Sequence, residues 1–163
     1  MTRDASRTSR VKSLEDGALH AASARAARRR VVFTNGVFDI LHPGHVRYLQ
    51  QARALGDLLI IGLNADASVR RNKGPQRPIN DERERAEILA ALECVDCVVI
   101  FADDTPAEII KAIGPDVLVK GADWAEDAIV GRDTVEARGG RVVRVPVEQG
   151  YSTTSIIDKI RTL

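Results

Sequence analysis

Five short apolar runs, separated by segments with helical spacing, constrain the fold of this 163-residue chain more than any other feature. The runs are rich in Val, Ile, Leu and Phe. The run at residues 58–63 is apolar throughout, which is typical of a parallel strand covered on both faces. We predict strands at residues 31–34, 58–63, 97–101, 117–120 and 141–145. Strands that alternate with helices favour a doubly wound α/β fold with a mainly parallel, five-stranded sheet.

The segments between these runs carry helix-start signals and helical spacing. We predict helices over residues 13–27, 43–54, 80–92, 105–113 and 153–161, with shorter helical turns near residues 66 and 133–137. Residues 70–75 are basic and are predicted to form a loop. The first 12 residues are polar, and we expect them to be a disordered tail in front of one domain over residues 13–163.

The segment from Thr34 to His45 joins a predicted strand to a predicted helix. Pro43 suits the first turn of a helix, so His42 and His45 flank a helix N-terminus. Free backbone N–H groups and the positive end of the helix dipole favour anions there. Gly44 has no side chain and allows a phosphate to approach the backbone. The local chemistry is a phosphate site with two imidazole donors.

In an open parallel sheet, ligands bind beyond the carboxyl ends of the strands. Thr34, Asn64, Lys120 and the loop over residues 145–150 all lie at such ends. The motif and the predicted fold therefore indicate the same crevice.

The pattern Gly36-x-Phe38-Asp39-x-x-His42-x-Gly44-His45 resembles the signature of the HxGH nucleotidyltransferases. These enzymes transfer a nucleoside monophosphate from a nucleoside triphosphate to a phosphate or carboxylate acceptor. The resemblance implies a Rossmann-like nucleotidyltransferase fold, with Mg²⁺ bound mainly through the ATP phosphates and no dedicated protein metal site. It implies His42, His45 and Lys73 as catalytic residues.

The resemblance also implies contacts to the two substrates. The expected nucleotide and phosphate contacts are Thr34, Asn35, Gly36, Phe38, Asp39, Gly44, Arg85, Lys120, Gly121, Asp123, Ser152, Thr153 and Thr154, and the expected contacts to the acceptor are Asn64, Arg77 and Trp124. Several of these residues have a simpler interpretation as well. Lys73 could belong to a solvated loop, Arg85 to a surface ion pair, and Ser152 to a helix cap.

Within the superfamily, the resemblance is most specific to the heptose 1-phosphate adenylyltransferases. It rests on Lys73-Gly74-x-x-Arg77-Pro78-Ile79-Asn80, Leu118-Val119-Lys120-Gly121-x-Asp123 and Gly150-x-Ser152-Thr153-Thr154. It implies transfer of AMP from ATP to a heptose 1-phosphate, which gives ADP-heptose for bacterial lipopolysaccharide or surface-polysaccharide synthesis. The chain resembles the stand-alone counterpart of the nucleotidyltransferase half of bifunctional ADP-heptose synthases.

Two alternatives are open. One is a glycerol-3-phosphate cytidylyltransferase, which typically carries Arg-Thr where this chain has Val147-Glu148. The other is a nucleotide-binding module without turnover, which the presence of both histidines and Lys73 disfavours.

Composition narrows the partners and the location. Lys and Arg total 24 against 23 Asp and Glu, so the charge does not indicate nucleic acid. No apolar run approaches the roughly 18 residues that span a membrane. We expect a cytoplasmic homodimer that acts on ATP and a sugar 1-phosphate, with no nucleic-acid or membrane partner. Cys94 and Cys97 form a C-x-x-C that lacks further zinc ligands and leads into a strand, so we interpret them as buried apolar residues.

Overall fold

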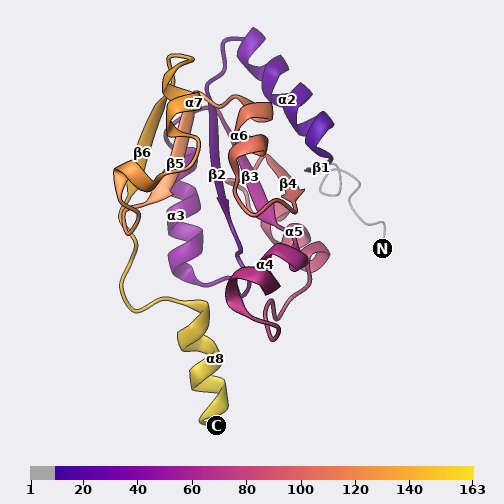
Figure 1. Ribbon diagram of the computed structural model, residues 1–163, viewed down its shortest axis with the longest axis vertical. Helices are drawn as coiled ribbons and strands as arrows, with labels where there is room; N and C mark the ends of the chain where they lie inside the picture. The colour runs from indigo at the N-terminus through magenta and orange to yellow at the C-terminus, as the bar shows by residue number, and fades with distance from the viewer. Residues whose placement is uncertain (1–9) are drawn as a thin grey trace.

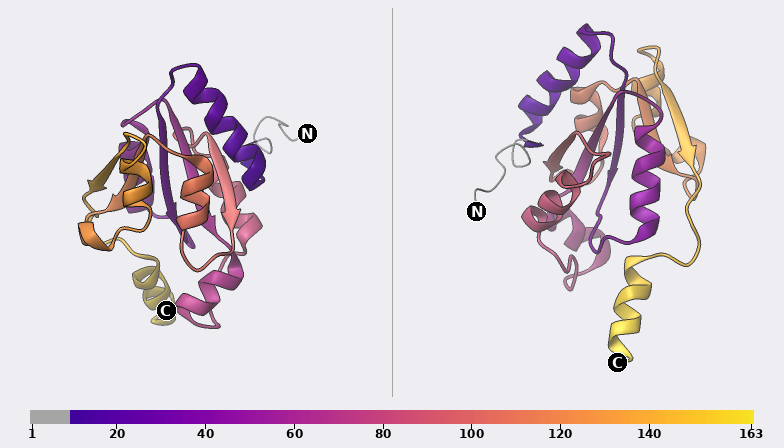
Figure 2. Two further views of the ribbon diagram at one scale, coloured as in Figure 1. Left: turned by 45° about the horizontal axis from the view of Figure 1, so that its top comes forward. Right: turned by 180° about the vertical axis from the view of Figure 1, so that it is seen from behind.

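The six strands of the computed structural model form a parallel sheet with the order β1-β4-β3-β2-β5-β6. The structure describes residues 10–163. The strands are β1 (Val11–Lys12), β2 (Val31–Gly36), β3 (Leu58–Asn64), β4 (Cys97–Phe101), β5 (Val117–Gly121) and β6 (Arg141–Val145). Helices lie on both faces of the sheet (Figures 1 and 2), which confirms the predicted doubly wound α/β fold.

The helices fall into two layers and one projecting element. Their bounds are α2 (Leu14–Ala26), α3 (Pro43–Arg53), α4 (Asp66–Lys73), α5 (Glu82–Ala90), α6 (Ala107–Ile113), the 3₁₀ helix η1 (Glu126–Ala128), α7 (Arg132–Glu136) and α8 (Thr153–Arg161). Apolar residues of α2, α6 and α7 pack in the core on one face, and those of α3 and α5 pack in the core on the other. Helix α8 extends away from the sheet (Figure 1) and buries none of its residues.

Three helices begin where the sequence predicts, and a side chain caps each of these starts. The Ser13 hydroxyl accepts from the Asp16 amide at 3.0 Å to start α2. Asp81 forms a capping box with Glu84 at the start of α5, and Ser152 caps α8. Each cap satisfies backbone N–H groups that have no partner inside the helix.

Two local predictions are corrected by the structure. Lys12 and Val11 were expected in a disordered tail, but they form the edge strand β1 against Val98 and Val99 of β4, so the sheet has six strands instead of five. A two-residue strand has too few side chains to show a pattern, and its N–H and C=O groups pair with the open edge of β4. The rest of the predicted tail, residues 1–9, lies outside the described residues.

The second correction concerns the basic segment that was expected to be a loop. Residues 70–73 form the last turn of α4, and the chain leaves the helix at Gly74, which has a φ of 97°. Basic side chains in a last helical turn interact favourably with the negative end of the helix dipole. Lys73 therefore projects from the end of a helix.

The strand order reverses at β2, which lies between β3 and β5. In such sheets, the crevice beyond the carboxyl ends of the strands at this point is the usual ligand site. Figure 1 shows that α8 extends from this same end of the sheet. No helix within residues 10–163 combines the length and the apolar character that a membrane span requires.

Candidate active site

A cavity of about 420 Å³ lies beyond the carboxyl ends of β2 and β5. It brings together three segments that are far apart in the sequence: the HxGH motif, the end of α4 with the loop after it, and the turn before α8. Most of the predicted site residues line it, namely Asn35, Gly36, Phe38, Asp39, His42, Gly44, His45, Lys73, Arg77, Gly121, Asp123, Ser152, Thr153 and Thr154.

The two motif histidines form a stacked pair at the start of α3. His42 is the N-cap residue, and its Nδ1 accepts from the His45 amide at 3.3 Å. The ring centroids are 3.7 Å apart, and the rings are inclined by 19°. Burial, followed by the nearby charge of His42, lowers the pKa of His45 to about 4, and burial lowers the pKa of His42. Both imidazoles are therefore neutral in the free protein at pH 7, and a bound anion would favour their protonation.

The Nδ1 atom of His45 is buried and has no hydrogen-bond partner among residues 10–163. A buried polar atom without a partner is costly and marks a place where a ligand, water or ion is expected. Gly44, within the motif, lies against the C-terminal turn: a Cβ there would be 3.0 Å from both His42 Nδ1 and Tyr151 Cβ. A larger residue at this position would displace one of these two side chains.

Asp39 is a buried carboxylate that holds a loop against the motif. It accepts from Arg77 Nε at 2.7 Å and from the backbone amides of Ile79 and Asn80 at 2.9 and 3.0 Å. Burial alone would raise the pKa of Asp39, but the bonds from Asn80, Ile79 and Arg77 lower it below its ordinary value. Both carboxylate oxygens are occupied by protein donors, so Asp39 orients the loop and is not free to ligate a metal.

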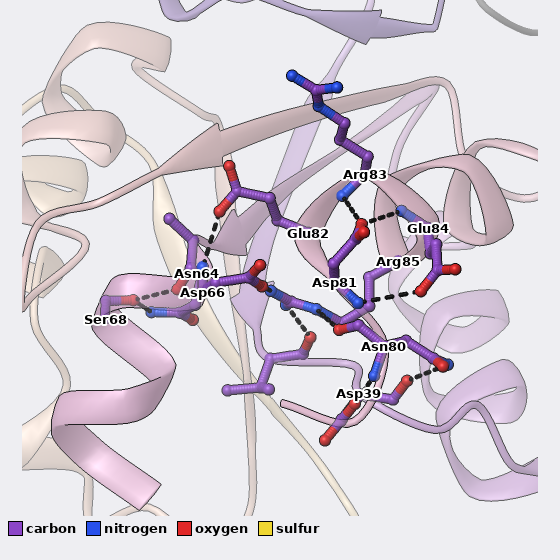
Figure 3. A network of polar contacts seen from close by, with 12 residues as sticks. Asp39, Asn64, Asp66, Ser68, Asn80, Asp81, Glu82, Arg83, Glu84 and Arg85 are labelled. Carbon is purple, nitrogen blue, oxygen red and sulfur yellow. Dashed lines mark hydrogen bonds and ion pairs between the residues drawn. The ribbon is translucent and has the colours of Figure 1, made fainter. Parts of the chain in front are cut away.

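Arg85 is fully buried next to this network and does not line the cavity (Figure 3). Its guanidinium donates to Asp66 Oδ1 and Val37 O, both at 2.7 Å, and to Asn80 O at 3.0 Å. These acceptors take three of the five guanidinium N–H donors, and the phosphate contact that the resemblance implies at Arg85 stays a prediction. In this structure, Arg85 supports the backbone of the motif and of the loop that follows Arg77.

Thr34 lies behind the wall of the cavity. Its buried hydroxyl donates to Val119 O at 3.0 Å and shares a 2.8 Å hydrogen bond with the hydroxyl of Tyr48. Tyr48 in turn lines the cavity, and burial raises its pKa to about 12, so it is a neutral phenol. The Thr34 hydroxyl thereby links β2 to α3, and the nucleotide contact that the resemblance implies at Thr34 stays a prediction.

A second cavity, of about 500 Å³, adjoins the first. The predicted residues Asn64, Lys120 and Trp124 line it. The Lys120 ammonium donates to Asn35 Oδ1 and lies 5.8 Å from the centroid of the Trp124 ring, and burial lowers the pKa of Lys120 to about 8. The two cavities share Asn35, Gly36, Val37, Tyr48, Lys73 and Gly121, so these residues face both.

Three residues that the sequence analysis does not name, Val37, Tyr48 and Tyr151, also line the first cavity, together with Val147 and Glu148 of the 145–150 loop that it places at the crevice. The Tyr151 ring lies nearly parallel to that of His42, with centroids 6.2 Å apart, and the Arg47 guanidinium is 5.5 Å from its centroid. Arg47 also pairs with Glu148. Helical spacing could have indicated Tyr48 as a site residue, because it follows His45 by three residues and so lies on the same face of α3.

No group of three or more His, Cys, Asp and Glu side chains within residues 10–163 is arranged to hold a metal ion. The carboxylates in the first cavity are Asp39, whose oxygens are occupied, Asp123 and Glu148. This donor set fits a divalent ion carried by the phosphates of a ligand better than one bound in a protein cage. Cys97 is buried and unpaired, and burial raises its pKa to about 11, as expected for an inert thiol.

The chain matches the cytidylyltransferase-like family over residues 33–159. It is 55% identical over 152 residues to the bifunctional protein HldE of Citrifermentans bemidjiense, and 58% identical over 136 residues to HldE of Syntrophotalea carbinolica. These matches cover 93% and 83% of this chain but 31% and 28% of the relatives. The chain therefore spans less than a third of the length of these curated relatives.

Two solved structures have the same fold. A lipopolysaccharide core biosynthesis protein from Thermoplasma volcanium is 31% identical, with a TM-score of 0.61 over 76% of this chain and 99% of that one. A protein of unknown function from Archaeoglobus fulgidus is 23% identical, with a TM-score of 0.56 over 76% of this chain and 93% of that one. Together with the HxGH cavity, the match over residues 33–159 confirms the resemblance on which the sequence analysis rests. The chain belongs to the cytidylyltransferase-like family of nucleotidyltransferases.

Proposed function

We propose that this chain transfers AMP from ATP to a heptose 1-phosphate, giving ADP-heptose and pyrophosphate. The observation that carries the proposal is the identity of 55% to HldE across 93% of the chain, and the family match over residues 33–159 includes every residue of the HxGH cavity. The C-terminal domain of HldE is a heptose 1-phosphate adenylyltransferase. ADP-heptose would supply bacterial lipopolysaccharide or surface-polysaccharide synthesis.

The two adjoining cavities suit two substrates that react in line. We assign the triphosphate to the first cavity, between the His42–His45 pair and the Ser152–Thr154 turn, and the sugar phosphate to the second. Lys73 lines both cavities and is positioned to contact phosphates on either side of the reacting phosphorus. The adenine base would lie near Gly121 and Asp123.

The reaction is a direct displacement at the α-phosphorus of ATP. An oxygen of the acceptor phosphate forms the new P–O bond while the bond to the leaving pyrophosphate breaks, so no covalent intermediate forms. The acceptor is already an anion and needs no general base. The protein has to stabilise the charge that develops on the α-phosphate oxygens and on pyrophosphate.

His42, His45 and the N-terminus of α3 supply this stabilisation. The imidazoles, neutral in the free protein, each donate one hydrogen bond to the developing charge, and the negative charge of the bound triphosphate raises their pKa. Lys73 follows the charge on the leaving phosphates. A divalent ion, which we propose to be Mg²⁺, would neutralise phosphate charge and be held by the ligand's own oxygens. We further propose that the chain acts in the cytoplasm as a homodimer.

The test is a matrix of the four nucleoside triphosphates against heptose 1-phosphates and glycerol 3-phosphate, scored by pyrophosphate release. We expect fast turnover with ATP and a heptose 1-phosphate only, because a base pocket that leaves a buried polar group unpaired rejects the wrong base strongly. Turnover of CTP with glycerol 3-phosphate would replace this assignment by the cytidylyltransferase alternative. Binding of ATP without release of pyrophosphate for any acceptor would indicate a non-catalytic module.

A further inference from the structure

A second concentration of charge lies at the opposite end of the sheet from the active site. A cavity of about 610 Å³ opens there, between the loop that joins α2 to β2 and the first residue of β6. Its charged lining residues are Arg25, Arg28, Arg29, Arg30, Asp57, Asp116 and Arg141. They carry a net charge of +3, whereas the whole chain carries +1. Figure 1 shows the α2–β2 loop at the end of the molecule farthest from α8.

The two aspartates balance only part of the charge of the five arginines. Asp57 Oδ2 accepts from the Arg30 backbone amide at 2.7 Å, and Asp116 Oδ2 accepts from the Val31 amide at 2.8 Å. Both carboxylates thus hold the backbone in place where β2 begins. Among the described residues, none of the five arginines forms an ion pair with a carboxylate, whereas seven arginines elsewhere in residues 10–163 do.

Two of the five guanidiniums are bound to the protein backbone. Arg25 donates to Ile113 O and Gly114 O at 2.7 and 2.9 Å, at the end of α6, and Arg29 donates to Asp57 O at 3.0 Å. Burial, followed by the charge of Arg138, lowers the pKa of Arg25, and the charge of Asp116 offsets part of this effect. The arginines at this end of the molecule therefore outnumber the carboxylates that could balance them.

The other three guanidiniums are free to bind a ligand. The side chains of Arg28, Arg30 and Arg141 are exposed and make no hydrogen bond to another residue within the described part of the chain. They come from two elements, the α2–β2 loop and β6, and they border the same cavity. Each guanidinium offers five N–H donors in a planar fork that matches two oxygens of a phosphate group.

We propose that this arginine cavity is a second binding site, for a small polyphosphate anion held by Arg28, Arg30 and Arg141. Several guanidiniums around one cavity suit a di- or triphosphate better than a single carboxylate. These arginines border one cavity on a chain of nearly zero net charge, which fits a small anion better than a nucleic acid. The arginine cavity shares no lining residue with the two cavities of the active site, so its occupancy is separable from catalysis.

The test is calorimetric titration of the full chain with inorganic pyrophosphate at about 0.15 M salt, which screens surface charge. The variant is Arg28→Gln with Arg141→Gln. The matched control is Arg83→Gln with Arg161→Gln, which removes the same charge from exposed positions away from the cavity. We expect the Arg28/Arg141 variant to weaken one binding event by ~10-fold or more, because it removes charge-assisted hydrogen bonds, and the control to leave that event unchanged.

Pyrophosphate is also a product of the proposed reaction, so the active-site event needs its own marker. We expect Lys73→Ala to weaken that event and to leave the one that depends on Arg28 and Arg141 intact. Thermal unfolding of every variant separates lost binding from lost folding. The single variant Arg30→Gln is measured in the same two ways. If the Arg28/Arg141 variant and the control weaken the binding of pyrophosphate equally, or if neither weakens it, the site holds an adventitious ion only and the proposal is overturned.

Discussion

The two halves of the active site are anchored to the protein in opposite ways. The HxGH half is braced by a buried network in which Asp39 and Arg85 together bind the motif and the loop from Arg77 to Asn80. The C-terminal half, the Ser152–Thr154 turn, opens α8, which buries no residue. The turn itself makes one long hydrogen bond to the motif half, from Thr153 Oγ1 to Ile40 O at 3.4 Å, and the residues just before it contact His42 and Arg47 through partly exposed side chains.

This contrast assigns different tasks to the two halves. Catalysis by the histidines requires that their N–H donors are held rigidly in place. A donor that already points at the developing charge lowers the barrier, because the protein does not have to reorganise during the reaction. A segment with little buried surface has low local stability and is ordered at the expense of binding energy. We therefore expect changes in the HxGH half to affect turnover and folding, and changes in the C-terminal turn to affect mainly nucleotide affinity.

The largest effect is expected for the histidines. His42→Ala and His45→Ala should each lower kcat by ~10²–10³-fold, because each loses a donor directed at transition-state charge. The KM for ATP should change little. Steady-state kinetics for both substrates measure the two parameters separately. A rise in KM with an intact kcat would make the histidines simple substrate-binding residues and would remove the contrast between the halves.

The next effect concerns the buried arginine that braces the motif. Arg85→Met should lower the free energy of unfolding by ~3 kcal/mol, because Asp66 and two backbone carbonyls lose their shared donor. Urea unfolding measures this loss. Arg83→Met, on the exposed side of the same helix, is the control and should be close to neutral. If the Arg85→Met protein is stable and has a strongly raised KM for ATP, the result would support the phosphate contact that the resemblance predicts at Arg85.

A smaller effect is expected at the start of α8. Ser152→Ala removes the cap of that helix, which is worth ~1 kcal/mol locally. Since α8 adds little to the core, the midpoint of global unfolding should stay unchanged while the KM for ATP rises several-fold. Ser155→Ala is the matched control, because Ser155 does not line the cavity. A clear drop in global stability for Ser152→Ala would show that the turn is anchored as firmly as the motif.

Stability should also depend on pH through His45. Its pKa is about 4 in the folded protein against 6.5 for an unperturbed histidine, so the unfolded state binds the proton more readily between these values. Above pH 6.5 the group makes no difference, and as the pH falls towards 4 it destabilises the fold, by about 1 kcal/mol after allowance for solvent screening. The difference in unfolding free energy between wild type and His45→Gln, followed from pH 7.5 to 4.5, should shift in favour of the variant. A constant difference would contradict the low pKa.

The smallest effect is expected for the cysteines. Cys94→Ala with Cys97→Ala should leave kcat, KM and metal content unchanged, because neither residue lines either cavity of the active site. Mass spectrometry of metals and kinetics with and without a reductant provide the measurement. Loss of bound zinc, or activity that follows the redox state of the thiols, would make the C-x-x-C functional.

The sequence by itself determined the helices and strands that are specified by residues close together in the chain. Continuous apolar runs fix the central strands, because a parallel strand covered on both faces has no polar side. Ser13, Asp81 and Ser152 fix helix starts, because capping involves only the next three residues. The HxGH pattern, at the junction of a strand and a helix, predicted an anion site and the family before any contact was known.

Only the tertiary structure decided which side chains face the cavities. The resemblance implies nucleotide contacts for Arg85 and Thr34, but protein acceptors surround the Arg85 guanidinium and the Tyr48 hydroxyl bonds to that of Thr34. Tyr151 lies in the site because the chain returns past the motif after β6. The arginine cavity joins the end of α2 to the start of β6 in the same way. Burial and the direction of a side chain depend on residues that are distant in the sequence, and no local pattern carries that information.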